Sequence, residues 1–248
     1  MAIHYENSPI TEALIDIRVD LPSDATLNTL DAIHVEVADH YPVKKKRVYV
    51  QGEFSTGDEI GAAAKQTIMG FVLSTPDGKQ IVQVRLDGFT FSRLRPYGTW
   101  GELRDEARQL WDIYRRTVKP RAITRVAVRY INQIDIPLEN IDYKDYFRTG
   151  PEISRILPQQ LSGFFMQLQF PQRDFGGTLI LTQAAFEPPQ PNGNSIVLDL
   201  DVFKDCVDVQ SDEDVWQLLE ILRNRKNQFF EGCLTDNTRD LFGTRRNY

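Results

Sequence analysis

The sequence contains few of the side chains that carry most catalysis and metal binding. It has two cysteines, Cys206 and Cys233, and neither belongs to a Cys-x-x-Cys pair. Two isolated thiols argue against a disulfide framework and favour a reducing compartment, so the sequence predicts a cytoplasmic protein. The three histidines are His4, His34 and His40, which leaves little material for a triad of nucleophile, histidine and carboxylate.

The motifs of common nucleotide-binding and hydrolytic enzymes are also absent. The sequence has no GxxxxGK[ST], GxGxxG, GxSxG or HExxH pattern, and so neither the usual phosphate cradle nor a nucleophile elbow. In the run from His34 to His40, Glu36, Asp39 and His40 could share one helix face. Two or three mixed ligands on a solvated helix fall short of a closed zinc site. The sequence therefore predicts a non-enzymatic protein with no metal and no cofactor.

The chain has no long hydrophobic run and no excess of positive charge. Its longest uncharged stretch, Ile156–Gln172, is rich in Gln and contains two prolines, so it is too polar to span a bilayer. The first residues show no basic region followed by an apolar core, so we expect no secretory signal. Asp and Glu number 35 against 29 Lys and Arg, a net charge of −6. Such a chain repels polyanions at long range.

What the sequence does contain is a regular order of strands and amphipathic helices. Apolar and polar side chains alternate in residues 9–22, which predicts a strand with one solvated face. The capping box Thr99-Trp-Gly-Glu102 predicts the start of a long helix that ends at Pro120. Similar patterns predict strands at 48–54, 67–73, 80–86, 89–97, 123–137, 164–170, 178–186 and 196–203, helices at 27–41, 143–147, 152–157, 211–230 and 235–242, and an irregular segment at 55–66.

This order of elements predicts an α+β fold, with a largely antiparallel sheet and long helices packed on one face. The segment that begins at Ile123 repeats the pattern of the first strand, and a comparable series of strands and a long helix follows it. We therefore predict a single globular unit, residues 1–248, that is pseudo-duplicated at about 1–120 and 121–248. Each half would have the order β-α-β(n)-α.

Charge is segregated along the chain. Residues 91–130 contain ten Arg and Lys against four Asp and Glu, whereas residues 199–240 contain five against eleven. Alternation places several arginines on the sheet face that the helices leave uncovered, where they could contact a partner. The acidic and basic segments could also pair between two copies. The candidate binding residues are Arg85, Arg93, Arg95, Arg125, Arg129 and Asn132.

An alternative explanation of the same arginines is ion pairing between strands. Asp16, Asp199 and Asp201 also fall on polar strand faces by alternation. If they pair with Arg125 and Arg129, the charges support the sheet and do not bind a partner.

Several short segments occur in a fixed order along the whole chain. They are Pro9-Ile-Thr-Glu-Ala13, Phe91-Ser-Arg93 with Tyr97 and Trp100, Ile123-x-Arg125, Arg129-Tyr-Ile-Asn132, Leu198-Asp-Leu-Asp-x-Phe203, and Phe229-Phe230 followed by Leu234-Thr-Asp236. Together they resemble a sporadically distributed, functionally uncharacterised family of prokaryotic proteins with the Arg-Tyr-Ile-Asn motif. The resemblance implies no catalytic residue. The patchy distribution implies genes that move horizontally, in mobile-element, toxin–antitoxin or defence contexts.

Three binding functions follow from these patterns, beside an enzyme of unfamiliar type. The first is a protein-interaction module that binds a partner, or itself, through an exposed sheet face. The second is a carrier for a small-molecule or acyl ligand in a helix-grip-like cavity. The third is a weak, salt-sensitive nucleic-acid binder. Its basic residues would be Arg93, Arg95, Arg115, Arg116, Lys119, Arg121, Arg125 and Arg129. The aromatic residues that would line the carrier's cavity are Phe164, Phe165, Phe170, Phe175, Trp216, Phe229 and Phe230.

Overall fold

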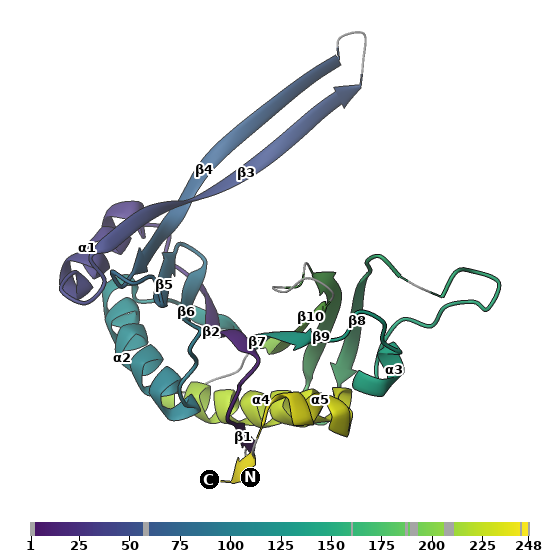
Figure 1. Cartoon of the computed structure of the whole chain (residues 1–248). Coiled ribbons are helices and arrows are strands. Elements are labelled where there is room, and N and C mark those ends of the chain that lie inside the picture. Colours follow the sequence, from purple (N-terminus) through teal and green to yellow (C-terminus); the bar gives the residue numbers. More distant parts are fainter. Residues whose placement is uncertain are drawn as a thin grey trace.

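A curved sheet of nine strands is the centre of the molecule, and helices cover its outer side (Figure 1). The computed structural model describes residues 3–56, 60–159, 161–186, 188, 193–205, 211–243 and 245–247. The strands of the sheet are β2 (Ile10–Asp20), β3 (Val43–Thr56), β4 (Ile60–Ser74), β5 (Gln80–Arg85), β6 (Gly88–Leu94), β7 (Ala122–Ile136), β8 (Phe165–Gln172), β9 (Gly177–Phe186) and β10 (Asn194–Asp205). A separate pair, β1 (Ile3–Tyr5) and β11 (Arg245–Asn247), joins the two ends of the chain.

All neighbouring strands are antiparallel, in the order β3-β4-β5-β6-β2-β7-β10-β9-β8. The predicted α+β class with a largely antiparallel sheet is therefore confirmed. The central pair is β2 and β7, the two strands whose sequences resemble each other. The division into two duplicated halves stays a prediction.

Long helices pack on one face of the sheet, as the sequence predicts. They are α1 (Leu27–Val37), α2 (Trp100–Val118) and α4 (Asp212–Cys233), and the short helices are α3 (Tyr143–Tyr146) and α5 (Asp236–Leu241). Helix α2 begins at the predicted capping box, where the Thr99 hydroxyl accepts a hydrogen bond from the Glu102 N–H. It ends at Lys119, whose φ of 49° is left-handed, directly before Pro120.

The core lies between this helix layer and the sheet. The apolar stripe of α2 buries Leu103, Trp111 and Tyr114 against the face of the sheet that carries Ile17 and Phe89. The Trp111 and Tyr114 rings stack at 5.6 Å between centroids, and both contact the Phe89 ring at 5.9 Å. Burial of such aromatic side chains stabilises the fold by several kcal/mol each.

Two of the local predictions are wrong. The sequence predicts an irregular segment at 55–66, but β3 continues to Thr56 and β4 begins at Ile60. The two long strands satisfy each other's backbone groups, and this pairing does not depend on an alternating pattern. Residues 152–157 form no helix; Ile156 is 91% exposed, so no packing supports one there.

The β3–β4 ribbon is the most extended part of the molecule. Figure 1 shows it projecting well beyond the helices and the rest of the sheet. The pairing runs from Val43 opposite Ser74 to Thr56 opposite Ile60. Within the part of the chain that the structure describes, no helix is both long and apolar enough to cross a membrane. Cys233 is buried and free, and Cys206 lies outside the described residues.

Candidate interaction surface

The helices leave the inner, concave side of the sheet uncovered (Figure 1). Strand alternation sends Ile15, Val128 and Leu200 to the helix side, and their neighbours in sequence to the other side. We call that other side the concave face. Its centre is formed by Asp16, Arg18, Arg85, Thr90, Arg125, Arg129, Asp199 and Asp201, with Asp87 and Asp205 at its margin.

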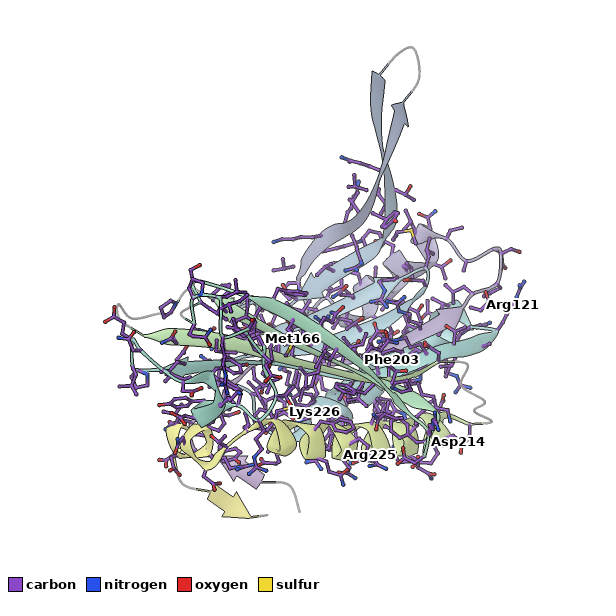
Figure 2. The ribbon with its side chains drawn as sticks, turned by 90° about the vertical axis from the view of Figure 1, so that its right-hand side faces the viewer. Arg121, Met166, Phe203, Asp214, Arg225 and Lys226 are labelled. Carbon is purple, nitrogen blue, oxygen red and sulfur yellow. The ribbon has the colours of Figure 1, made fainter. Side chains whose placement is uncertain are left out.

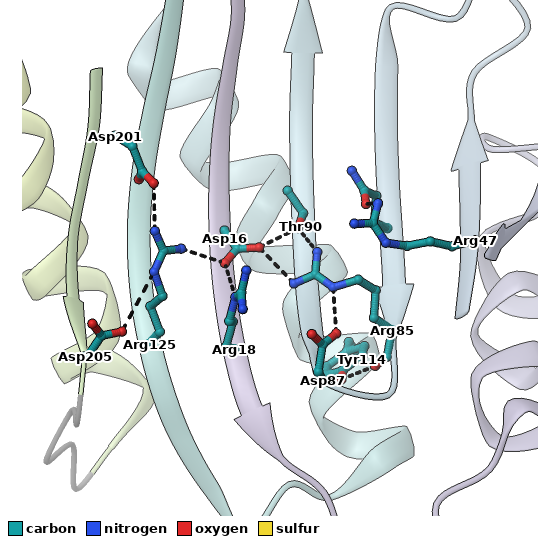
Figure 3. Close-up of polar contacts among 11 residues, drawn as sticks. Asp16, Arg18, Arg47, Arg85, Asp87, Thr90, Tyr114, Arg125, Asp201 and Asp205 are labelled. Atoms are coloured by element: carbon teal, nitrogen blue, oxygen red, sulfur yellow. Dashed lines mark hydrogen bonds and ion pairs between the residues drawn. The ribbon is translucent and has the colours of Figure 1, made fainter. Parts of the chain in front are cut away.

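Asp16 is the central acceptor of the concave face (Figure 3). Its Oδ2 accepts hydrogen bonds from Arg85 Nη2 at 2.9 Å and from the Thr90 hydroxyl at 2.7 Å. Its Oδ1 accepts one from Arg125 Nη1 at 3.0 Å. Burial raises the pKa of the Asp16 carboxyl, but Arg85, Thr90 and Arg125 outweigh burial, and the pKa lies below its usual value. Asp16 is therefore a stable carboxylate, not a proton donor.

Arg85 is buried because glycines flank it on both sides. Its partners across the sheet are Gly70 on β4 and Gly88 on β6. Both have φ of 154°, and a Cβ on Gly88 would lie 3.0 Å from Arg85 Nη2 and closer still to backbone atoms. The space left by the missing side chains lets the guanidinium lie across the sheet toward Asp16. The Tyr114 hydroxyl donates to the Arg85 carbonyl at 2.8 Å and so connects α2 to this strand.

Arg125 and Arg129 also pair across strands. Arg125 Nη2 donates to Asp201 Oδ2 at 2.8 Å, and its guanidinium lies over the Phe203 ring at 4.2 Å. Arg129 binds Asp199 through both Nε and Nη2, the bidentate geometry that gives the strongest ion pairs. Burial holds the pKa of Asp201 above its usual value despite both arginines. Arg125 and Arg129 therefore form the inter-strand ion pairs of the alternative explanation.

The other three candidates do not belong to this surface. Arg93 points to the helix side, where its Nη1 lies 3.3 Å from Glu102 Oε2 of α2. Arg95 follows β6 and donates to the Pro9 carbonyl at 3.3 Å. Asn132 is 1% exposed on the helix-covered face, and its amide donates to the Leu198 carbonyl at 2.9 Å. The structure brings Arg85, Arg125 and Arg129 together and leaves these three apart.

The segregated charges of the sequence meet within one chain. Helices α2 and α4 lie side by side, and the basic residues of α2 pair with acidic residues of α4. Arg104 Nη1 lies 2.9 Å from Glu220 Oε1, and the Trp100 indole donates to the same oxygen at 2.7 Å. Two more pairs, Arg108–Glu213 and Arg115–Asp212, continue along the helices. These arginines therefore do not form an unopposed basic patch.

The sequence did not indicate which apolar side chains remain exposed on the folded protein. On β3, Val48, Tyr49 and Val50 are 44%, 59% and 56% exposed. On β8, Phe165 is 72% exposed. The apolar run at residues 48–50 predicted a strand correctly, but alternation cannot show that both faces of a projecting ribbon lack a covering layer.

The described part of the chain has solvent-open hollows but no cluster of metal ligands. Among the described residues, no group of three or more His, Cys, Asp and Glu side chains could hold a metal ion. One solvent-open hollow lies beside His40, Lys79 and Arg93, at the margin of β5 and β6. Of the aromatic residues proposed for a carrier, Trp216 is buried in the core and Phe165 is exposed.

Comparison with known proteins adds no assignment. No protein-family model matches the chain, and no curated protein matches it significantly.

Proposed function

We propose that the protein is a non-enzymatic interaction module that holds a protein partner against its concave face, with the β3–β4 ribbon as a clasp. The main support for this proposal is the set of apolar side chains exposed on the ribbon. Its Val48, Tyr49 and Val50 are exposed at successive positions, so apolar side chains emerge on both of its sides. A partner that covers the ribbon would remove this apolar area from water.

The rest of the chain adds little to the stability of the ribbon. The pairing of β4 with β5 ends where Gly70 lies opposite Arg85, and beyond it the two-stranded ribbon has no third described strand and no helix beside it (Figure 1). Isolated two-stranded ribbons are marginally stable in water. Contact with a partner would therefore order the ribbon as well as cover its apolar side chains.

The charges of the concave face favour a protein surface over a polyanion. Arg85, Arg125 and Arg129 each already bind a carboxylate of the same face. A phosphate backbone would have to displace these carboxylates, at the cost of leaving them buried without a counter-charge. A mixed protein surface, with apolar contacts for the ribbon and polar contacts for the rim, requires no such exchange.

The test is capture of a defined partner with a matched pair of variants. Products of neighbouring genes are the first candidates, because they are the proteins present with this one. We expect Tyr49→Asp to weaken capture at least tenfold. Ile221→Asp, on the outer side of α4 and 48% exposed, should leave capture unchanged. Hydrogen exchange at the β3–β4 amides should slow in the complex.

Equal loss of capture in both variants would show a general surface effect and contradict the proposal. Unchanged exchange at the ribbon in a stable complex would place the interface elsewhere. A chain that binds none of the candidate proteins would remove its support.

A further inference from the structure

Among the described residues, no strand pairs with the outer edge of β3 or of β8, and these two edges differ in charge. At the β3 edge, Lys44, Lys45, Lys46 and Arg47 follow one another. Consecutive positive charges on an edge strand repel a second copy of the same edge, and natural proteins use such residues to prevent edge pairing. The β3 edge is therefore protected at its base.

The β8 edge has no such protection. Its sequence, FMQLQFPQ, contains no charged residue. Phe165 is 72% exposed and Phe170 40% exposed. Figure 2 turns the molecule so that the side with β8 faces the viewer. An uncharged edge strand with exposed aromatic rings is a template for strand addition.

The backbone pattern shows which groups point outward. The Ala185 N–H donates to the Phe164 carbonyl at 3.0 Å, so residues at even positions of β8 face β9. The backbone N–H and C=O groups of Phe165, Gln167 and Gln169 then point away from the sheet. Pro171 occupies the last outward position, where it removes a single donor and does not interrupt the pairing with β9.

We propose that β8 pairs with β8 of a second copy of this chain, antiparallel and centred on Leu168. The two-fold axis then passes between the two Leu168 residues. Gln167 lies opposite Gln169 of the second copy on the concave face, and Met166 lies opposite Phe170 on the helix side. No charge opposes a like charge in this register, and both exposed phenylalanines gain contacts across the interface.

This arrangement continues the sheet from one copy into the next. Antiparallel edge pairing uses an axis perpendicular to the sheet, so both concave faces open to the same side. The two β3–β4 ribbons would stand at opposite ends of the joint sheet. The inference concerns the edge alone and does not depend on the proposed partner.

Charged substitutions on β8 test whether this edge pairs with the same edge of a second copy. Light scattering should give twice the mass of the 28.6 kDa chain for the wild type at tens of micromolar. The double variants Gln167→Lys/Gln169→Lys and Gln167→Glu/Gln169→Glu should each halve that mass, because four like charges meet at the axis. A mixture of the two should recover the doubled mass. Circular dichroism and melting temperature establish that each variant is folded.

Disulfide formation tests the register. Leu168→Cys places two thiols opposite each other at a non-hydrogen-bonded pair, where Cα atoms lie ~4.5 Å apart and suit a disulfide. Phe170→Cys is the control, since its counterpart in the second copy is Met166. We expect covalent dimers from Leu168→Cys at least tenfold faster than from Phe170→Cys. A monomeric wild type at every concentration, equal crosslinking by both variants, or a mixture of charged variants that stays monomeric would overturn the proposal.

Discussion

Arg85 and Asp16 form an ion pair with 2.9 Å between Nη2 and Oδ2, and both residues are buried although they lie on the uncovered face of the sheet. Neighbouring side chains of the same face provide this burial, since Thr90 and Arg125 also contact the Asp16 carboxylate. A charge pair in this setting stabilises the fold only while both partners are present.

Asp16→Asn should therefore destabilise the protein strongly. The substitution keeps the shape but leaves the buried Arg85 guanidinium with only the half-exposed Asp87 as its counter-charge, and we expect a loss of ~2–4 kcal/mol in the free energy of unfolding. Arg18→Gln is the control, because the Arg18 side chain is 52% exposed, and it should cost under about 1 kcal/mol. Urea denaturation at pH 7 measures both. Similar losses in the two variants would contradict the structural role of the pair.

The same carboxyl should contribute to loss of stability in acid. The pKa of Asp16 is lower in the folded protein than the usual value of an aspartate, because Arg85, Thr90 and Arg125 outweigh its burial. Its contribution is therefore present above the unfolded pKa and is lost as the pH falls through the folded value. Wild-type stability should decline more steeply below about pH 4 than that of Asp16→Asn. Parallel pH profiles of the two proteins would show that other carboxyls account for the decline.

Arg125 and Arg129 should differ in their effects on stability. The Arg125 side chain is 16% exposed and bridges Asp16 and Asp201, whereas the Arg129 side chain is 44% exposed. We expect Arg125→Gln to cost ~2–4 kcal/mol, because it removes the ion pair with Asp201 and one of the ion pairs of the buried Asp16. Arg129→Gln also removes the partner of a carboxylate, Asp199, whose side chain is only 10% exposed, but solvent reaches the Arg129 guanidinium, so the loss should be smaller, about 1–2 kcal/mol. Thermal and urea unfolding rank the two, and the reverse order would be evidence against this account.

Lys226 should make stability rise with pH. Its ammonium lies 3.6 Å from the centre of the Tyr130 ring on the buried side of α4. Burial, and then Arg223, lower the pKa of Lys226 to about 7, against an opposing effect of Glu231. The unfolded state therefore binds more protons between pH 7 and 10.5, and the free energy of unfolding increases across that window.

Lys226→Met tests this dependence. At ~1.4 kcal/mol per pKa unit, removing the buried ammonium should stabilise the protein by a few kcal/mol at pH 7. It should also flatten the pH profile between about 7 and 10, as measured by urea denaturation. A destabilised variant with an unchanged slope would show that the lysine remains charged and is favourably placed over Tyr130.

Trp111→Ala should have the largest effect of any α2 substitution. The side chain is fully buried and stacks on Tyr114, so truncation should cost ~3–5 kcal/mol. Val35→Ala, at a position 75% exposed, should leave the melting temperature nearly unchanged. Small and equal effects would mean that α2 contributes little to the core.

The sequence by itself determined the features that depend on near neighbours. The start of α2 at Thr99 and its buried stripe follow from side chains three or four residues apart. The placement of Arg125 and Arg129 on one face follows from the two-residue period of a strand. The α+β class and the antiparallel sheet follow in the same way, because they depend on the order and period of consecutive segments.

Tertiary structure alone decided which partners these side chains meet. Arg115 reaches Asp212 and Arg125 reaches Asp16, residues about a hundred positions apart. Arg85 could lie flat only because strand order places Gly70 and Gly88 beside it. Similarly, the paired length of β3 and β4, and the free edge at β8, depend on which backbone groups find a neighbour. Periodicity along one segment carries no information about which other segment packs beside it, and that pairing decides whether an arginine is free to bind or already bound.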